Sequence, residues 1–94
     1  MGGSEEKARR HFKRAIELSK GLKASPYVAL ASSVSVKNQN IKEFTDLLNK
    51  ALAIDVNVRL ENRLANIMAQ RKAQWLIDHR EDRFLSDIKE GDKK

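Results

Sequence analysis

The sequence contains no cysteine, which excludes a disulfide framework and a thiolate zinc site. No glycine-rich phosphate-binding loop is present among its few glycines. No stretch approaches the roughly 20 apolar residues that a membrane-spanning helix needs. The opening Met1–Ser4 lacks the apolar core of a signal peptide. We interpret residues 1–3 as a remnant of cloning and expect the chain to be a fragment of something longer.

The sequence also offers little for catalysis or metal binding. His11 and His79 are its only histidines, and the carboxylates beside His79 make at most a weak metal site. An edge histidine on an amphipathic helix is the favoured interpretation. Asp78, Glu81 and Asp82 alternate with arginines, which is typical of surface ion pairs and not of a catalytic carboxylate pair in a cleft. We therefore assign no catalytic residue, no metal ligand and no cofactor.

Basic residues are what the sequence has in excess. The net charge is +6, of which +4 falls in residues 1–23, 0 in residues 24–58 and +2 in residues 59–94. A basic surface can bind nucleic acid or an acidic partner. In the first segment the cations alternate with Glu5, Glu6 and Glu17, so a solvated helix face is the simpler interpretation.

Apolar residues recur at helical spacing in four segments, which predicts an all-α fold. The first helix is expected over residues 4–19 with Gly21 as its stop, and the second opens at Ser25-Pro26. Asn40 is expected to cap the third helix. A long last helix should begin between residues 58 and 61 and end near 84 or 85. The expected apolar stripes are Ala8, Phe12, Ala15 and Ile16; Tyr27, Leu30, Ala31 and Val34; Ile41, Phe44, Leu47, Leu48, Ala51 and Leu52; and Leu60, Leu64, Ile67, Met68, Trp75, Leu76 and Ile77, with Ala65, Ala69 and Ala73 between them.

These helices are expected to form one small domain. At 94 residues the chain has room for a single helical array. We place that domain at residues 4–86, with a polar tail at residues 87–94.

The spacing of bulky and small residues resembles a tetratricopeptide repeat. Tyr27, Leu30, Ala31 and Val34 match the first helix of that repeat, and residues 44–51 match its second helix. The resemblance implies antiparallel helical hairpins stacked in an array, followed by the long C-terminal helix. Such arrays commonly act as scaffolds that bind a partner.

A narrower resemblance covers residues 11–85. Residues 11–18, 24–31, 61–66 and 69–76 are similar to the T-component family of TRAP (tripartite ATP-independent periplasmic) transporters. That resemblance implies a periplasmic, helical, non-catalytic protein that associates with the substrate-binding protein of the transporter. It implies a protein partner and no cofactor.

Five residues are candidate partner-binding residues: Tyr27, Asn62, Asn66, Arg71 and Trp75. Tyr27 is expected to fill the gap between neighbouring hairpins, with a partner contact as the alternative. Trp75 continues the apolar stripe of the last helix, so core packing is favoured over contact with a base or a partner. Arg71 lies four residues before Trp75 and can share its face.

Two further hypotheses remain open at this point. The positive charge, with Arg71, Lys72 and Trp75, suggests a basic helical module that binds nucleic acid. The long last helix carries more apolar length than two short neighbours can cover, which suggests a homo-oligomer. An enzyme is the least favoured class.

Overall fold

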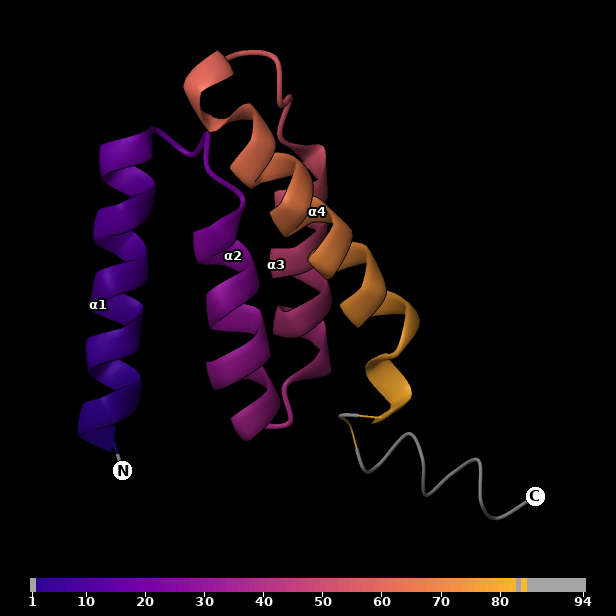
Figure 1. Cartoon of the computed structure of the whole chain (residues 1–94). Coiled ribbons are helices and arrows are strands. Elements are labelled where there is room, and N and C mark those ends of the chain that lie inside the picture. Colours follow the sequence, from indigo (N-terminus) through magenta and orange to yellow (C-terminus); the bar gives the residue numbers. More distant parts are fainter. Residues whose placement is uncertain (1, 83, 85–94) are drawn as a thin grey trace.

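Four helices packed against one another make up the fold (Figure 1). The computed structural model describes residues 2–82 and 84, and side chains from Glu5 onward. No strand occurs among these residues, so the all-α prediction is confirmed. The elements are α1 (Gly2–Ser19), α2 (Ser25–Leu30) with its π-helical continuation η1 (Ala31–Ser35), α3 (Ile41–Ala53), the 3-10 turn η2 (Leu60–Asn62), α4 (Arg63–Asp78) and the 3-10 turn η3 (Arg80–Asp82).

Successive helices run antiparallel; α2 lies between α1 and α3, and α4 crosses in front of α3 in the view of Figure 1. The repeat-like stacking of hairpins remains a prediction. Gly2 and Gly3, which were interpreted as a remnant, lie in the first turn of α1. The predicted domain boundary at residue 86 and the tail 87–94 fall outside the described residues.

α1 ends where the sequence predicts. Gly21 adopts a φ of 73°, a conformation that glycine accepts at little cost. Its N–H donates to the Ile16 carbonyl at 2.9 Å, which satisfies a carbonyl of the last helical turn. The chain can then turn sharply, so that α2 returns beside α1.

α2 begins with Ser25 and Pro26 in its first turn, but the N-cap is Ala24 and no side chain caps the helix. The helix widens to a π-helix from Ala31 to Ser35. Ser32 and Ser33 donate from Oγ to the Ala29 carbonyl, at 3.3 and 2.7 Å, and such bonds compete with the regular helical ladder. The serine and valine residues here therefore distort the helix without ending it.

α3 follows its sequence signals closely. The Asn40 side chain accepts a hydrogen bond from the Glu43 N–H at 3.1 Å, which confirms the predicted cap. Four members of the predicted stripe are buried: Phe44, Leu47, Leu48 and Ala51. They form the centre of the hydrophobic core, against which the other helices pack.

α4 differs from its prediction in length and in orientation. It ends at Asp78, and the six residues that follow Ile77 are polar, so no apolar stripe holds a longer helix against the core. The predicted stripe is largely exposed: Leu64 is 71% and Met68 is 62% exposed. The residues that α4 buries are Asn66 and three of the predicted apolar positions, namely Ala69, Ala73 and Leu76. Small side chains let α4 approach α2 and α3 closely.

Candidate protein-binding surface

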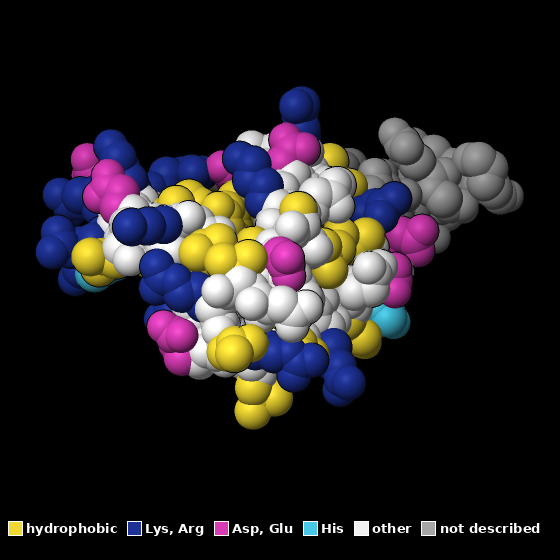
Figure 2. All heavy atoms as spheres, turned by 90° about the horizontal axis from the view of Figure 1, so that it is seen from above, with side chains coloured by type: hydrophobic (Ala, Val, Ile, Leu, Met, Phe, Trp, Pro, Cys, Tyr) yellow, Lys and Arg dark blue, Asp and Glu magenta, His cyan; other side chains and the backbone are white. Residues whose placement is uncertain are grey.

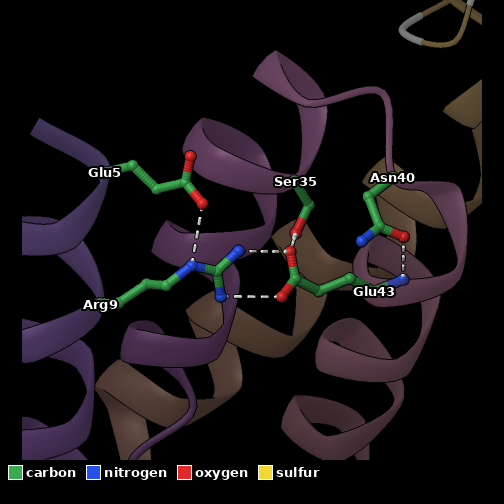
Figure 3. A network of polar contacts seen from close by, with 5 residues as sticks. All are labelled: Glu5, Arg9, Ser35, Asn40 and Glu43. Carbon is green, nitrogen blue, oxygen red and sulfur yellow. Dashed lines mark hydrogen bonds and ion pairs between the residues drawn. The ribbon is translucent and has the colours of Figure 1, made fainter. Parts of the chain in front are cut away.

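α1 is attached to α3 by a network of charged side chains (Figure 3). Arg9 donates from Nη1 and Nη2 to the two carboxylate oxygens of Glu43, at 2.8 and 3.2 Å. Its Nε donates to the carboxylate of Glu5, one turn earlier in α1, at 3.1 Å. Ser35 Oγ donates to Glu43 at 2.8 Å. Such two-pronged pairing fixes orientation as well as distance, so this network sets how α1 lies against the rest of the fold.

The same network shifts the pKa values of the charged residues in it. Hydrogen bonds from Arg9 lower the pKa of Glu43; burial raises it by less, and the Ser35 hydroxyl lowers it further. Hydrogen bonds from Arg9 and then from Asn38 lower the pKa of Glu5. The pKa of Arg9 is raised, chiefly by its bonds to Glu43. All three groups are therefore charged at neutral pH, as the network requires.

Two amide side chains on α4 hold the neighbouring loops. Asn66 accepts from the Ala24 N–H at 2.9 Å and donates to the Leu22 carbonyl at 2.9 Å. Gln70 donates from Nε2 to the carbonyls of Ala51 and Ile54, at 3.0 and 2.8 Å. Asn66 thus positions the connection between α1 and α2, and Gln70 holds the end of α3. Both bind main-chain groups in the loops and at the end of a helix, where the regular helical hydrogen bonds run out.

The outward face of α4 carries a row of large apolar side chains. Leu64, Met68 and Trp75 are exposed, and their spacing of four and seven residues places them on one side of the helix. Leu60, in η2, is 73% exposed just before them. We call Leu60, Leu64, Met68 and Trp75 the α4 apolar face. An exposed row of large hydrophobic side chains is a recurring mark of a protein contact.

A second feature lies along α2, which is flanked by a groove on each side. The groove between α1 and α2 has a volume of about 380 Å³, and its lining includes Phe12 and Leu30. The groove between α2 and α4 has a volume of about 730 Å³, and its lining includes Val28 and Met68. Both grooves share Ser25 and Ala29 on α2 and Ser33 on its continuation η1, and all three are exposed. We call the two grooves with this shared ridge the α2 trough.

Basic side chains surround these features. Figure 2 looks down on the molecule from above and shows Lys and Arg gathered around α1, with hydrophobic side chains reaching the surface between them. Lys72 lines the groove between α2 and α4. His11 lines the other groove, and Lys7 and Arg14 lie four residues before and three after it, along the same edge of α1. The setting favours a partner that carries negative charge.

The five candidate partner-binding residues differ in how exposed they are, and not all of them lie where the sequence predicts. Trp75 is 49% exposed and stacks on His79, with ring centroids 4.3 Å apart, so the expectation of core packing was wrong. Arg71 is exposed on the same helix, and Asn62 is half-buried in η2. Tyr27 is half-buried and packs edge-on against Phe12 between α1 and α2, with ring centroids 5.5 Å apart.

Asn66 is the candidate that this structure removes from the surface. It is only 3% exposed, and its amide is engaged by Ala24 and Leu22. It therefore holds a loop and offers nothing to a partner. Arg9, Glu43 and Gln70 organise the surface but were not singled out for that role, because partners far away in sequence leave no local pattern.

The described residues also bear on metal binding and on insertion into a membrane. They contain no group of three or more His, Cys, Asp or Glu side chains that would suit a metal ion. Among the same residues, no helix combines the length and the hydrophobicity that crossing a bilayer requires.

Comparison with known proteins gives two matches. A family described as TRAP transporter T-component matches residues 1–84. An uncharacterized protein of Treponema pallidum (strain Nichols) is 31% identical over 85 residues, which is 90% of this chain and 26% of that protein. The chain thus spans about a quarter of the length of the curated relative that it matches. No solved structure matches the chain. Neither match supports the nucleic-acid-binding hypothesis.

Proposed function

The chain belongs to the TRAP transporter T-component family, and from that membership we propose that it is a non-catalytic helical scaffold that binds the substrate-binding protein of a TRAP transporter. The family is one of transporter components and not of enzymes. The observation that carries the proposal is the match itself, which extends over residues 1–84 and so covers all four helices.

The surface is of the kind that this role needs. The α4 apolar face supplies large side chains that can be buried against another protein, and the α2 trough supplies a concave surface beside it. Protein interfaces draw much of their binding energy from a few large side chains of this type, with tryptophan and arginine enriched. Trp75 and Arg71 are therefore the residues that we place at the contact.

The proposal also places the protein on the periplasmic side of the membrane, since the family is a periplasmic-side component of the transporter. Its partner there is the soluble protein that captures the solute. In this role the scaffold presents the binding protein to the transporter and carries out no chemistry itself.

Titration calorimetry of this chain with the TRAP substrate-binding protein of the same organism tests the proposal. We expect a complex with micromolar or tighter affinity, which Trp75→Ala weakens. A substrate-binding protein of an ATP-driven importer serves as the control and should not bind. Absence of any heat or co-elution with the TRAP protein at several hundred micromolar would remove the transport role.

A further inference from the structure

The α2 trough has the shape of a cradle for a helix. Its ridge consists of Ser25, Ala29 and Ser33, one turn apart and all exposed, with side chains too small to keep another backbone away. A helix packs on another by placing rows of side chains into the grooves beside such a ridge. The two apolar grooves lie on either side of this ridge, where those rows would enter.

The charges around the trough select the partner. Among the described residues, no carboxylate lines either groove. Lys72 stands at one groove, and Lys7 and Arg14 share the His11 edge of the other. A ligand with an apolar face and acidic flanks would match both features, because its carboxylates would reach the cations on both sides of the trough.

We propose that the α2 trough binds an acidic amphipathic helix of the partner protein, with apolar side chains in the two grooves and carboxylates beside Lys72 and the Lys7–Arg14 edge. This inference rests on the proposed function only in taking the partner to be a protein. Binding of an amphipathic helix in an apolar groove is a recurrent mode of recognition.

The two alternative occupants match the trough less well, one in its charge and the other in its apolar lining. Among the described residues, a second copy of this chain offers no helix with an excess of acidic side chains. α1 carries five Lys or Arg against three Glu, α3 carries two against two acids, and α4 carries three against one. A nucleic acid would match the cations but would leave the apolar lining of both grooves without a complementary surface.

A designed peptide tests the inference directly. The probe is a fluorescein-labelled helix of about 18 residues, with leucine at every third or fourth position and glutamate on both flanks. A second peptide has lysine in place of each glutamate. We expect the acidic peptide to bind at least about tenfold more tightly at low salt, with an affinity that falls as salt is added. Equal binding of the two peptides would overturn the inference.

Matched variants locate the binding site. Ala29→Trp fills the ridge without changing charge, whereas Ala53→Trp makes the same change on exposed α3 surface. Lys72→Glu reverses a charge at the groove, and Lys50→Glu reverses one on α3. We expect a loss of about tenfold or more from the first member of each pair and little change from the second. Circular dichroism melts check that each variant is folded.

Several outcomes would overturn the inference. If Ala29→Trp weakens peptide binding no more than Ala53→Trp does, the helix does not lie in the trough. If the chain self-associates and Ala29→Trp abolishes this self-association, the trough is the interface of a homo-oligomer. If an oligonucleotide displaces the peptide, and its binding depends on Lys72 and Arg14 but not on the ridge, these cations serve nucleic-acid binding instead.

The same variants separate this inference from the proposed function. If the substrate-binding protein binds but neither Ala29→Trp nor Lys72→Glu weakens it, the scaffold role stands and the trough is not its contact. If the acidic peptide binds in the trough while the substrate-binding protein does not bind, the trough inference stands and the transport role fails.

Discussion

Phe84 packs edge-on against Phe44, with ring centroids 4.9 Å apart, although it lies six residues beyond the end of α4. Phe84 is 1% exposed and Phe44 is fully buried at the centre of the core. The polar residues after Ile77 end α4, and the chain then brings Phe84 back to α3. A single aromatic side chain thus completes the core from outside the helices.

Phe84→Ala should be among the most damaging single substitutions in this chain. Truncation of a buried phenylalanine leaves a cavity and costs about 3–5 kcal/mol of unfolding free energy. Urea unfolding followed by circular dichroism measures the loss. Leu64→Ala removes a side chain that is 71% exposed and should cost less than about 0.5 kcal/mol. Similar losses from the two variants would contradict the burial of Phe84.

Removal of Arg9 should loosen α1 from α3. Arg9→Ala breaks the paired hydrogen bonds to Glu43, and the expected cost is about 1–2 kcal/mol because the pair is partly exposed. Arg10→Ala, on the exposed side of the same helix, is the control. A double-mutant cycle with Glu43→Gln should show a coupling energy. Independent, additive effects would mean that the ion pair does not hold α1.

The pH dependence of stability should report on Glu43. Its pKa is lowered in the folded chain, chiefly by Arg9, from the ordinary value of 4.5 that the unfolded chain keeps. The unfolded state therefore binds protons first as pH falls, so the stabilisation is present above about pH 5 and is lost below it. The difference in melting temperature between the wild type and Glu43→Gln should shrink from pH 7 to pH 3. A constant difference would exclude this linkage.

Local signals in the sequence were sufficient to predict where α1 ends and where α3 begins. Gly21 ends one helix and Asn40 begins the other, because turn and cap chemistry depends on residues within a few positions. The stripe that includes Phe44 and Leu48 is regular enough to identify the buried face of α3. These elements therefore required no knowledge of the tertiary structure.

The face that α4 buries was not predictable in the same way. Its large side chains Leu64, Met68 and Trp75 are exposed, whereas the side that packs against α2 and α3 carries Asn66, two alanines and Leu76. Hydrogen bonds to Leu22 and Ala24, more than forty residues away, decide this orientation. Such partners cannot be read from spacing along one helix, and for the same reason Trp75 was expected in the core.

Asn66→Ala should therefore be destabilising even though it removes a polar side chain. It leaves the N–H of fully buried Ala24 and the carbonyl of Leu22 without this partner, at an expected cost of about 2–3 kcal/mol. Chemical unfolding measures the loss. Asn49→Ala, at an exposed position in α3, should change stability by less than about 0.5 kcal/mol. A harmless Asn66→Ala would return Asn66 to the list of candidate partner contacts.

Trp75 provides a direct report on the α4 apolar face because it is the only tryptophan in the chain. Incorporation of 5-fluorotryptophan into this chain alone gives one fluorine resonance, even in the presence of a tryptophan-containing partner. If the face is part of the contact, addition of the TRAP substrate-binding protein should shift or broaden that resonance, since the ring is 49% exposed in the free chain.

Removal of the Trp75 side chain measures how much the ring contributes to the binding free energy. Trp75→Ala should weaken the complex by about tenfold or more, or roughly 1.4 kcal/mol, as expected for a large anchor at the centre of a contact. Val58→Ala, which shortens an exposed side chain in the loop before η2, should leave affinity within about twofold. An unchanged resonance in a saturated complex would place the partner elsewhere, and Trp75 would then be an exposed aromatic side chain without a binding role.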